Sequence, residues 1–384
     1  MDKIKVLVAP NSFKGSMNAL VAANAIEKGL LKASNQFDIV KAPIADGGDH
    51  FADIMIHALK GEMVSIEVQG PLYEAIDAVY GITPDGKTAI IEMAKASGLA
   101  LIEDTGLDAL KATSFGTGQL IRDALKKGCK KIILGIGGSA TTDAGAGILA
   151  ALGIAFFNKD QKAFIPAGGT LKEISTINTN TLLPELHNCV IEIACDVENP
   201  LVGNQGAAKI FSPQKGANAN QVLELEKNLA YFATLAEQFT GKIIANLKHG
   251  GAAGGIAAGL YAFLDAALIN GTELVLNQLN VKETLETNDI VITAEGKLDF
   301  QTLDGKGPYG LAIEAKKSNN IVIGIGGSIP ENNLEKFEAF DALFALPDSP
   351  MKLEKAMLEG ERLLENLSFQ IGKFIIAQQT RFYR

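Results

Sequence analysis

The chain has 384 residues, of which 47% are hydrophobic and 21% are charged, so it can bury a large core, and its length predicts about two domains. Its 35 basic and 44 acidic residues give a formal charge of −9, which argues against a sequence-independent nucleic-acid-binding protein. The three cysteines lack the spacing of zinc ligands, and the four histidines form no metal-binding motif. Because we find neither a signal-peptide pattern nor an uninterrupted apolar run long enough to span a membrane, we expect a cytoplasmic protein without membrane partners.

The first fifty residues predict two strands, each of which ends in a polar turn. Residues 4–9 form the first predicted strand, and residues 10–16 form the turn at its carboxyl end, before a helix over 19–33. Residues 39–43 predict the second strand, which runs into the turn 45–50. Because ligands of open α/β sheets bind at the carboxyl ends of the strands, both turns are candidate ligand-binding segments.

The middle of the chain begins with a different pattern. Residues 63–93 alternate apolar and polar side chains at intervals of two, and they predict an antiparallel meander. We therefore expect a domain change near residue 65. A helix over 113–127 follows, and residues 130–152 then predict a buried strand, a glycine-rich turn and a small apolar helix.

The turn within residues 130–152 is the strongest candidate for an anion-binding segment. It contains Gly137, Gly138 and Ser139 directly after the predicted strand, and Asp143 just before the helix. A turn of this kind directs backbone N–H groups and a helix N-terminus at a phosphate or a carboxylate. The alternative is that the glycines only allow the helix to pack closely on the sheet.

The remainder of the chain predicts further α/β structure. Strands are expected over 154–157 and 190–194, and an amphipathic helix over 220–239. A last α/β block begins with a strand over 290–293 and continues through a strand over 321–325 to the closing helices.

Two short patterns match nucleotide-binding motifs, and both have a better explanation. Residues 81–88 have the letters of a P-loop, but the segment after their Pro-Asp-Gly turn is β-branched, which predicts a hairpin. Residues 135–140 match a relaxed dinucleotide-binding fingerprint, with Asp160 about twenty residues further on. However, Asp160 lies in a segment with turn composition, and Asp143 would bring a second carboxylate to the pyrophosphate.

Acidic residues recur at the ends of predicted strands. They are Asp46, Asp143, Asp196, Glu295 and Asp299. Each alone is typical of a helix cap or a turn, because Asp bonds readily to nearby backbone. Together with Lys14 and Lys306, which lie beside glycines, they resemble the set that phosphoryl transfer needs: carboxylates for Mg²⁺ and the acceptor hydroxyl, and lysines for phosphate.

Short segments along the chain resemble, in the same order, the bacterial type 1 class of glycerate kinases. They are residues 9–15, 45–48, 135–141, 195–201, 213–216, 251–255 and 295–302. The resemblance implies an α/β fold of two domains: a Rossmann-like parallel-sheet domain built from both chain ends, 1–65 and 282–384, and an inserted mixed α/β domain, 66–281. It also implies a kinase that uses ATP and Mg²⁺ to convert D-glycerate into 2-phosphoglycerate, with the active site in the cleft between the domains.

On this resemblance we expect Asp196 to accept the proton of the substrate hydroxyl or to orient it, with Lys14 and Asp299 as further catalytic residues. Asp46 and Asp299 are the expected Mg²⁺ ligands. The expected substrate- and nucleotide-binding residues are Ser12, Lys14, Gly47, Gly48, Gly137, Gly138, Ser139, Asn199, Gln301 and Lys306.

The sequence departs from the family pattern at several positions. Asn11 stands where the family usually has Asp, which removes a charge that could face Mg²⁺ or phosphate, and Thr142 replaces a common Asn. Two alternatives therefore stay open: a nicotinamide-dependent oxidoreductase of a small hydroxy acid, based on residues 135–140, and a non-catalytic sugar-acid sensor, based on the departures. The expected partners are the small molecules glycerate and ATP, and a homodimer is one of the assembly states that the sequence allows.

Overall fold

The chain is α/β and divides into two compact units. The computed structural model describes residues 3–44, 51–103, 106–300, 302–304 and 307–382. One unit comprises both chain ends, Met1–Asp46 and Thr272–Arg384, and the other is continuous from Gly47 to Gly271. The sequence analysis placed the domain changes at 65/66 and 281/282. Position 65 lies inside strand β3 (Glu62–Gln69), which pairs along its length with β4 of the continuous unit.

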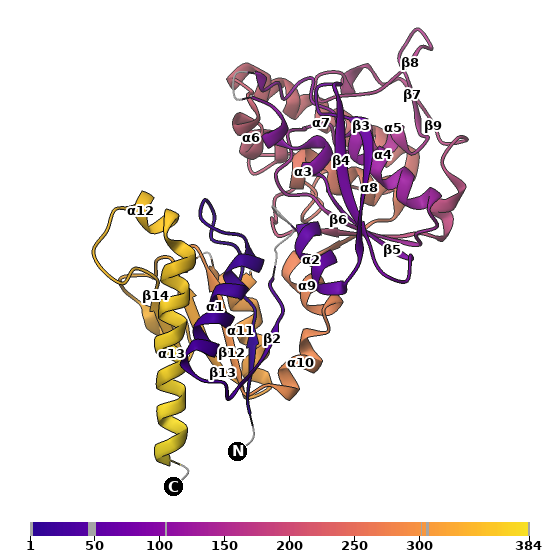
Figure 1. Cartoon of the computed structure of the whole chain (residues 1–384). Helices are drawn as coiled ribbons and strands as arrows, with labels where there is room; N and C mark the ends of the chain where they lie inside the picture. The colour runs from indigo at the N-terminus through magenta and orange to yellow at the C-terminus, as the bar shows by residue number, and fades with distance from the viewer. Residues whose placement is uncertain (1–2, 45–50, 104–105, 301, 305–306, 383–384) are drawn as a thin grey trace. The chain divides into compact units, whose positions relative to one another are not determined.

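The terminal unit contains a five-stranded parallel sheet with the strand order β14-β13-β12-β1-β2 (Figure 1). Its strands are β1 (Ile4–Val8), β2 (Phe37–Lys41), β12 (Ile290–Glu295), β13 (Ile321–Gly326) and β14 (Ala342–Ala345). Its helices are α1 (Ala19–Ala33), α10 (Val281–Thr287), α11 (Gly307–Lys317), α12 (Leu353–Leu358) and α13 (Gly360–Phe382), and α9 (Gly271–Gln278) starts at the boundary.

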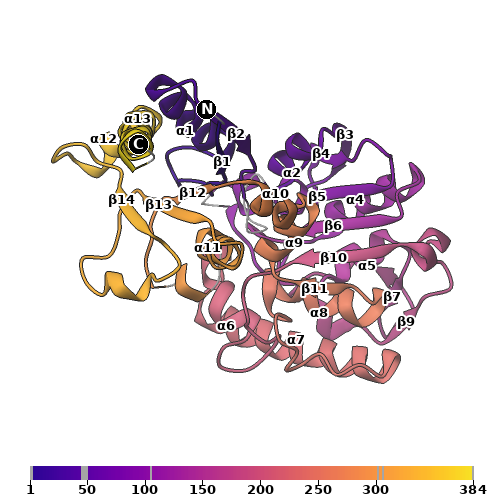
Figure 2. The ribbon, with the colours of Figure 1, turned by 90° about the horizontal axis from the view of Figure 1, so that it is seen from below.

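The two faces of this sheet are covered by different helices. Helices α1 and α13, from opposite ends of the chain, lie side by side on one face, and α11 covers the other (Figures 1 and 2). Val6 and Val8 of β1 join the core under α1 and α13, whereas Leu7 is buried toward the opposite face. Burial on both faces explains why β1 and β12 are mostly apolar, and why they could be recognised as parallel strands.

The continuous unit contains a six-stranded mixed sheet in the order β11-β10-β6-β5-β4-β3 (Figure 2). Its strands are β3 (Glu62–Gln69), β4 (Ala75–Ile82), β5 (Thr88–Glu92), β6 (Lys131–Gly135), β10 (Val190–Ala194) and β11 (Ala267–Ile269). Its helices are α2 (Phe51–Leu59), α3 (Ala94–Ser97), α4 (Phe115–Lys126), α5 (Ala146–Ala151), α6 (Ala207–Phe211), α7 (Ala219–Thr240) and α8 (Ala252–Leu264). A small antiparallel sheet is formed by β7 (Ala155–Phe157), β8 (Ala163–Phe164) and β9 (Thr176–Asn178).

The expected meander is confirmed, and the segments that match the two nucleotide motifs have structures that differ from what those motifs need. Strands β3, β4 and β5 pair in antiparallel order, and the segment after Gly86 is strand β5 rather than the helix of a P-loop. Asp160 lies in the turn between β7 and β8, where Gln161 N donates to Asn158 O at 3.0 Å. Within the described residues, no helix is both long and apolar enough to cross a membrane.

The crossing from β6 to α5 is held by one buried carboxylate. Asp143 is fully buried and accepts hydrogen bonds from Ser114 N at 2.9 Å, Ser114 Oγ at 2.7 Å, Gly145 N at 3.1 Å and Gly147 N at 3.3 Å. These donors lie at the N-termini of α4 and α5, where backbone N–H groups have no partner within the helix. One side chain therefore fixes the starts of two helices and the turn that precedes them.

A glycine in the non-helical first turn of α8 packs on the same turn. Gly254 has φ +69°, and a Cβ atom there would lie 2.6 Å from Thr142 Cα. The backbone of Gly254 lies so close to this turn that Ala144 N donates a hydrogen bond to Gly254 O at 3.1 Å. The close contact and the left-handed backbone both require glycine at this position.

Replacing Asp143 is expected to destabilise the protein even when its shape is kept. All four partners donate hydrogen bonds to Asp143. The NH₂ group of Asp143→Asn is itself a donor, so it could not accept from them. Asp143→Ala would leave all four donors without an acceptor. We expect either change to lower the free energy of unfolding by about 3 kcal/mol. Urea unfolding measures this, with the exposed turn residue change Asp160→Ala as a control expected to stay within ~0.5 kcal/mol. Wild-type stability of Asp143→Asn would contradict the bracing role.

Candidate active site

In the terminal unit, the turns after β1 and β12 lie against each other. Ala9 N donates to Ile292 O and Asn11 N to Ala294 O, so the chain continues beside β12 beyond the end of β1. A Cβ atom on Gly296 would lie 3.3 Å from Lys14 N. The predicted site residues Ser12 and Lys14 therefore lie at the same sheet edge as the residues that follow Glu295, and the Lys14 side chain is exposed there.

One threonine at this edge bonds to the carboxylate of Glu295 and to the backbone of Asp299. Thr302 Oγ1 donates to Glu295 Oε1 at 2.8 Å and accepts from Asp299 N at 3.1 Å. Asp299 Oδ2 also lies 3.0 Å from Lys297 Nζ. Glu295 and Asp299 therefore lie in one segment at the end of β12, and Thr302, which the sequence analysis did not single out, links the side chain of Glu295 to the backbone of Asp299.

The start of α11 is close to the position of the Asn11 departure. Gly307 N donates to Thr272 Oγ1 at 2.8 Å, and a Cβ atom on Gly307 would lie 3.2 Å from Asn11 Nδ2. Asn11 Oδ1 accepts from Ser12 N at 2.7 Å. The amide of Asn11 therefore shapes its own turn beside a helix N-terminus, which carries a partial positive charge.

In the continuous unit, the glycine turn after β6 carries the predicted residues Gly137, Gly138 and Ser139. Gly138 is exposed and has φ +67°, whereas Ser139 is buried. Lys215 packs against the buried side of this turn. Its Nζ donates to Ser139 Oγ at 2.9 Å and to Thr141 O at 2.5 Å. Lys215 is a member of the segment 213–216, but no role was predicted for it, because no predicted strand precedes it in the sequence.

Burial shifts the pKa of two groups around this turn. It lowers the pKa of Lys215 to about 7, and the negative charge of Asp143 opposes this shift. Burial also raises the pKa of Asp143, against the lowering effect of its hydrogen bonds to Ser114, Gly145 and Gly147. Since both oxygens of Asp143 are engaged by these donors, this acid shapes the turn rather than facing a ligand.

The loop after β10 holds Asp196 in a defined orientation. Asp196 Oδ1 accepts from Asn270 Nδ2 at 2.7 Å and from Gly271 N at 2.9 Å. Strand β10 pairs in parallel with β6, so Asp196 follows the strand next to the one that leads into Ser139. Asn199, a predicted binding residue, uses Nδ2 to donate to Gln205 O at 2.8 Å and so closes its own loop.

The predicted residues therefore form two groups, one in each unit. Ser12, Lys14 and Asp299 lie at the carboxyl edge of the terminal sheet, and Asp196, Asn199 and the turn of Gly137, Gly138 and Ser139 lie at that of the six-stranded sheet. Other predicted residues lie outside the described residues: Asp46, Gly47, Gly48, Gln301 and Lys306. Within the described part of the chain, no three His, Cys, Asp or Glu side chains are grouped as metal ligands.

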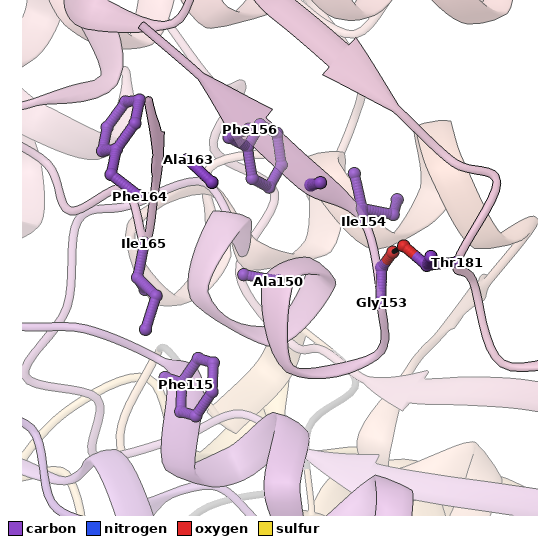
Figure 3. A pocket seen from close by; sticks show the side chains of 10 residues that line it. Phe115, Ala150, Gly153, Ile154, Phe156, Ala163, Phe164, Ile165 and Thr181 are labelled. Atoms are coloured by element: carbon purple, nitrogen blue, oxygen red, sulfur yellow. Dashed lines mark hydrogen bonds between the residues drawn. The ribbon is translucent and has the colours of Figure 1, made fainter. Parts of the chain in front are cut away.

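Two cavities contain none of the predicted site residues. One, of about 310 Å³, lies between the small sheet and α5 and is lined by Phe115, Phe156, Phe164 and other side chains without charge (Figure 3). The other, of about 890 Å³, lies between α13 and the amino ends of the strands of the terminal sheet. The first cannot neutralise an anionic substrate, and the second is at the opposite edge from Lys14 and Asp299.

The sequence matches the glycerate kinase family over residues 6–376. It is 44% identical to the glycerate kinase of Halalkalibacterium halodurans, over 96% of this chain and 97% of that protein. It is 43% identical to the glycerate 2-kinase of Escherichia coli K12, over 92% and 93% of the two chains. The structure resembles that of a protein from Salmonella typhimurium LT2 provisionally named glycerate kinase 2, with a TM-score of 0.89, 39% identity and coverage of 99% of this chain and 100% of that one.

These matches extend far beyond the short segments from which the family was predicted, and they confirm both that prediction and the expectation of a kinase enzyme. They agree with the fold, because a structure with the same α/β architecture covers nearly the whole chain. The chain belongs to the glycerate kinase family.

Proposed function

We propose that this protein is an ATP-dependent kinase that phosphorylates D-glycerate to 2-phosphoglycerate. The observation that carries the proposal is the family match along residues 6–376, together with a relative of the same length named glycerate 2-kinase. The local chemistry supports it: lysines, hydroxyls and carboxylates gather where parallel strands end, as phosphoryl transfer requires. The free thiols Cys129, Cys189 and Cys195 support a cytoplasmic location.

In the proposed reaction, a hydroxyl oxygen of glycerate attacks the γ-phosphorus of ATP in line with the bond that breaks. The bond between the γ-phosphorus and its bridging oxygen opens, ADP leaves, and the hydroxyl proton passes to a base. Asp196 is suited to that role because Asn270 and Gly271 fix its Oδ1 through two hydrogen bonds. Lys14, and the turn of Gly137, Gly138 and Ser139, are proposed to bind phosphate or the substrate carboxylate.

The residues at the edge of the terminal sheet fit Mg²⁺. Asp299 and Glu295 supply carboxylate oxygens in one segment that Thr302 orders through Glu295 Oε1 and Asp299 N. Mg²⁺ in kinases is bound by one or two carboxylates together with substrate phosphates. We propose Asp299 as a ligand, with Asp46 as a second, and the ion would neutralise charge on the phosphates when bound. Lys297 Nζ lies 3.0 Å from Asp299 Oδ2 and helps to orient this carboxylate.

The alternatives receive less support. The oxidoreductase hypothesis needs an acid on the nucleotide ribose, but Asp160 lies in the exposed turn between β7 and β8. The sensor hypothesis rests on departures from the family pattern such as Asn11. The Asn11 side chain accepts a hydrogen bond from Ser12 N, so it has a structural role in its own turn that does not require a sensor. A homodimer stays a prediction on which the proposed reaction does not depend.

The proposed function is tested with purified protein, D-glycerate, ATP and Mg²⁺. A coupled assay should detect ADP release only when all three are present, and phosphorus NMR of the product should give the signal of 2-phosphoglycerate. Reduction of a nicotinamide cofactor without ADP release would support the oxidoreductase instead. A product phosphorylated at the 3-position would keep the kinase and correct the hydroxyl.

Asp196→Asn is expected to lower kcat by at least ~100-fold, because the amide cannot accept the hydroxyl proton. The amide oxygen can still accept from Asn270 and Gly271, so the loop should keep its conformation. Steady-state kinetics measure the change, and Asp265→Asn, at a side chain 88% exposed, is the control that should keep the wild-type rate. Near-normal turnover of Asp196→Asn would move the role of base to another residue.

Asp299→Asn is expected to raise the Mg²⁺ concentration for half-maximal rate by about tenfold or more, because a charged ligand is lost. The matched control is Lys297→Met, which removes the ion-pair partner at 3.0 Å but leaves the carboxylate in place. It should leave the Mg²⁺ requirement unchanged or lower. If both variants titrate with Mg²⁺ like the wild type, Asp299 is not a ligand.

A further inference from the structure

Lys215 is a lysine in an unusual place. It ends the short segment Pro213–Lys215, and its side chain is only 2% exposed. Burying an ammonium group is unfavourable unless its charge is compensated, and lysine is rarely buried for stability alone. Within the described residues Lys215 forms no ion pair, and its recorded partners are the neutral oxygens of Ser139 and Thr141.

The charge of Lys215 acts on the turn after β6. Asp143 is the charged group that influences it, but the oxygens of Asp143 already accept from Ser114, Gly145 and Gly147. The hydroxyl groups of Thr141 and Thr142 are fully buried, and neither has a hydrogen-bond partner among the described residues. An amine that can take up a proton and two unused hydroxyl donors therefore lie at a turn whose Gly138 reaches the surface.

The bond to Lys215 also fixes how Ser139 can interact. Since Lys215 Nζ donates to Ser139 Oγ at 2.9 Å, that oxygen acts as an acceptor, and the hydroxyl hydrogen is directed away from Lys215. A hydroxyl polarised in this way is a better donor to an anion, because successive hydrogen bonds strengthen one another. Ser139 thus links the buried Lys215 to any anion that accepts its hydroxyl hydrogen.

We propose that Lys215 is the positioning cation of an anion site formed by Ser139, Thr141 and Thr142, and that it acts on the ligand through Ser139. The ligand is an anionic oxygen group, either the carboxylate of a hydroxy acid or a phosphate of a nucleotide. The inference rests on the proposed function only in that this function supplies both kinds of anion.

Anion binding at this site takes up a proton. Burial lowers the pKa of Lys215 to about 7, so in the free protein at pH 8 most molecules carry a neutral amine. A bound anion favours the charged form and raises that pKa, and the protein then binds up to about one proton per site. Asp143 is the other titratable group beside Lys215, and the Lys215→Met variant separates its contribution to proton uptake from that of Lys215.

Isothermal titration calorimetry at pH 8 in buffers of different ionisation enthalpy counts these protons. D-glycerate and ADP are titrated separately. Proton uptake with D-glycerate would assign the site to a carboxylate, and proton uptake with ADP would assign it to a phosphate. For the ligand that occupies the site, Lys215→Met should abolish the uptake and weaken binding by at least ~10-fold. Ser139→Ala, which keeps the ammonium but removes the linking hydroxyl, should also weaken binding of that ligand.

The matched control is Lys209→Met on the neighbouring helix α6, where Lys209 Nζ donates to Asn204 Oδ1 at 3.1 Å. It should change neither proton uptake nor affinity. Thermal unfolding separates function from folding: Lys215→Met should keep the wild-type midpoint or raise it, since a buried amine is removed. A lowered midpoint with unchanged proton uptake would show a merely structural lysine and overturn the proposal.

The inference and the proposed function fail in different ways. If the wild-type protein takes up no proton with either ligand, or if Lys215→Met takes up as many as the wild type, the inference is overturned even when glycerate is phosphorylated. If glycerate is not phosphorylated but ADP binds with proton uptake that depends on Lys215, the proposed function is overturned and the anion site stands.

Discussion

The parallel pairing of neighbouring strands is the constraint on which the candidate site depends. Because β1 pairs in parallel with β12, and β6 with β10, the turns after these strands emerge at a common edge of each sheet. Lys14 and Asp299 follow the first pair, and Ser139 and Asp196 follow the second. An antiparallel arrangement would have sent one turn of each pair to the opposite edge.

At the carboxyl edge of the six-stranded sheet, buried polar groups determine the shape of the turn after β6. Asp143 holds the starts of α4 and α5, and Lys215 holds the turn from below through Ser139 and Thr141. Both groups are removed from water, so each weakens stability in its charged form unless the surrounding dipoles compensate. Asp143 has donors on both oxygens, whereas the recorded partners of Lys215 are neutral acceptors. This difference separates a structural acid from a cation that is available to a ligand.

The two sheets use the same arrangement with different chemistry. At the terminal sheet, the carboxylates of Glu295 and Asp299 lie in one segment, and the nearby lysines Lys14 and Lys297 are accessible to solvent. At the six-stranded sheet, the cation is buried and the surface of the turn is glycine. The first set suits a solvated metal ion with phosphates, and the second suits an anionic group that has lost its water.

The sequence by itself determined the strands, the turns at their ends and the family. Apolar runs such as residues 132–136, and alternation over 63–93, are local patterns, so they can be read without knowledge of the fold. The helices predicted over 113–127 and 220–239 are found as Phe115–Lys126 and Ala219–Thr240 for the same reason.

Only the tertiary structure decided which polar groups meet. Lys215 and Ser139 are 76 residues apart in the chain, and Asn270 and Asp196 are 74 apart, so neither pair leaves a periodic signal. The sequence likewise placed Asp143 among candidate site acids, whereas its hydrogen bonds to Ser114 and the start of α5 make it a structural brace. A residue's role at this edge depends on which distant segment packs against it, and packing between distant segments is set by the whole core.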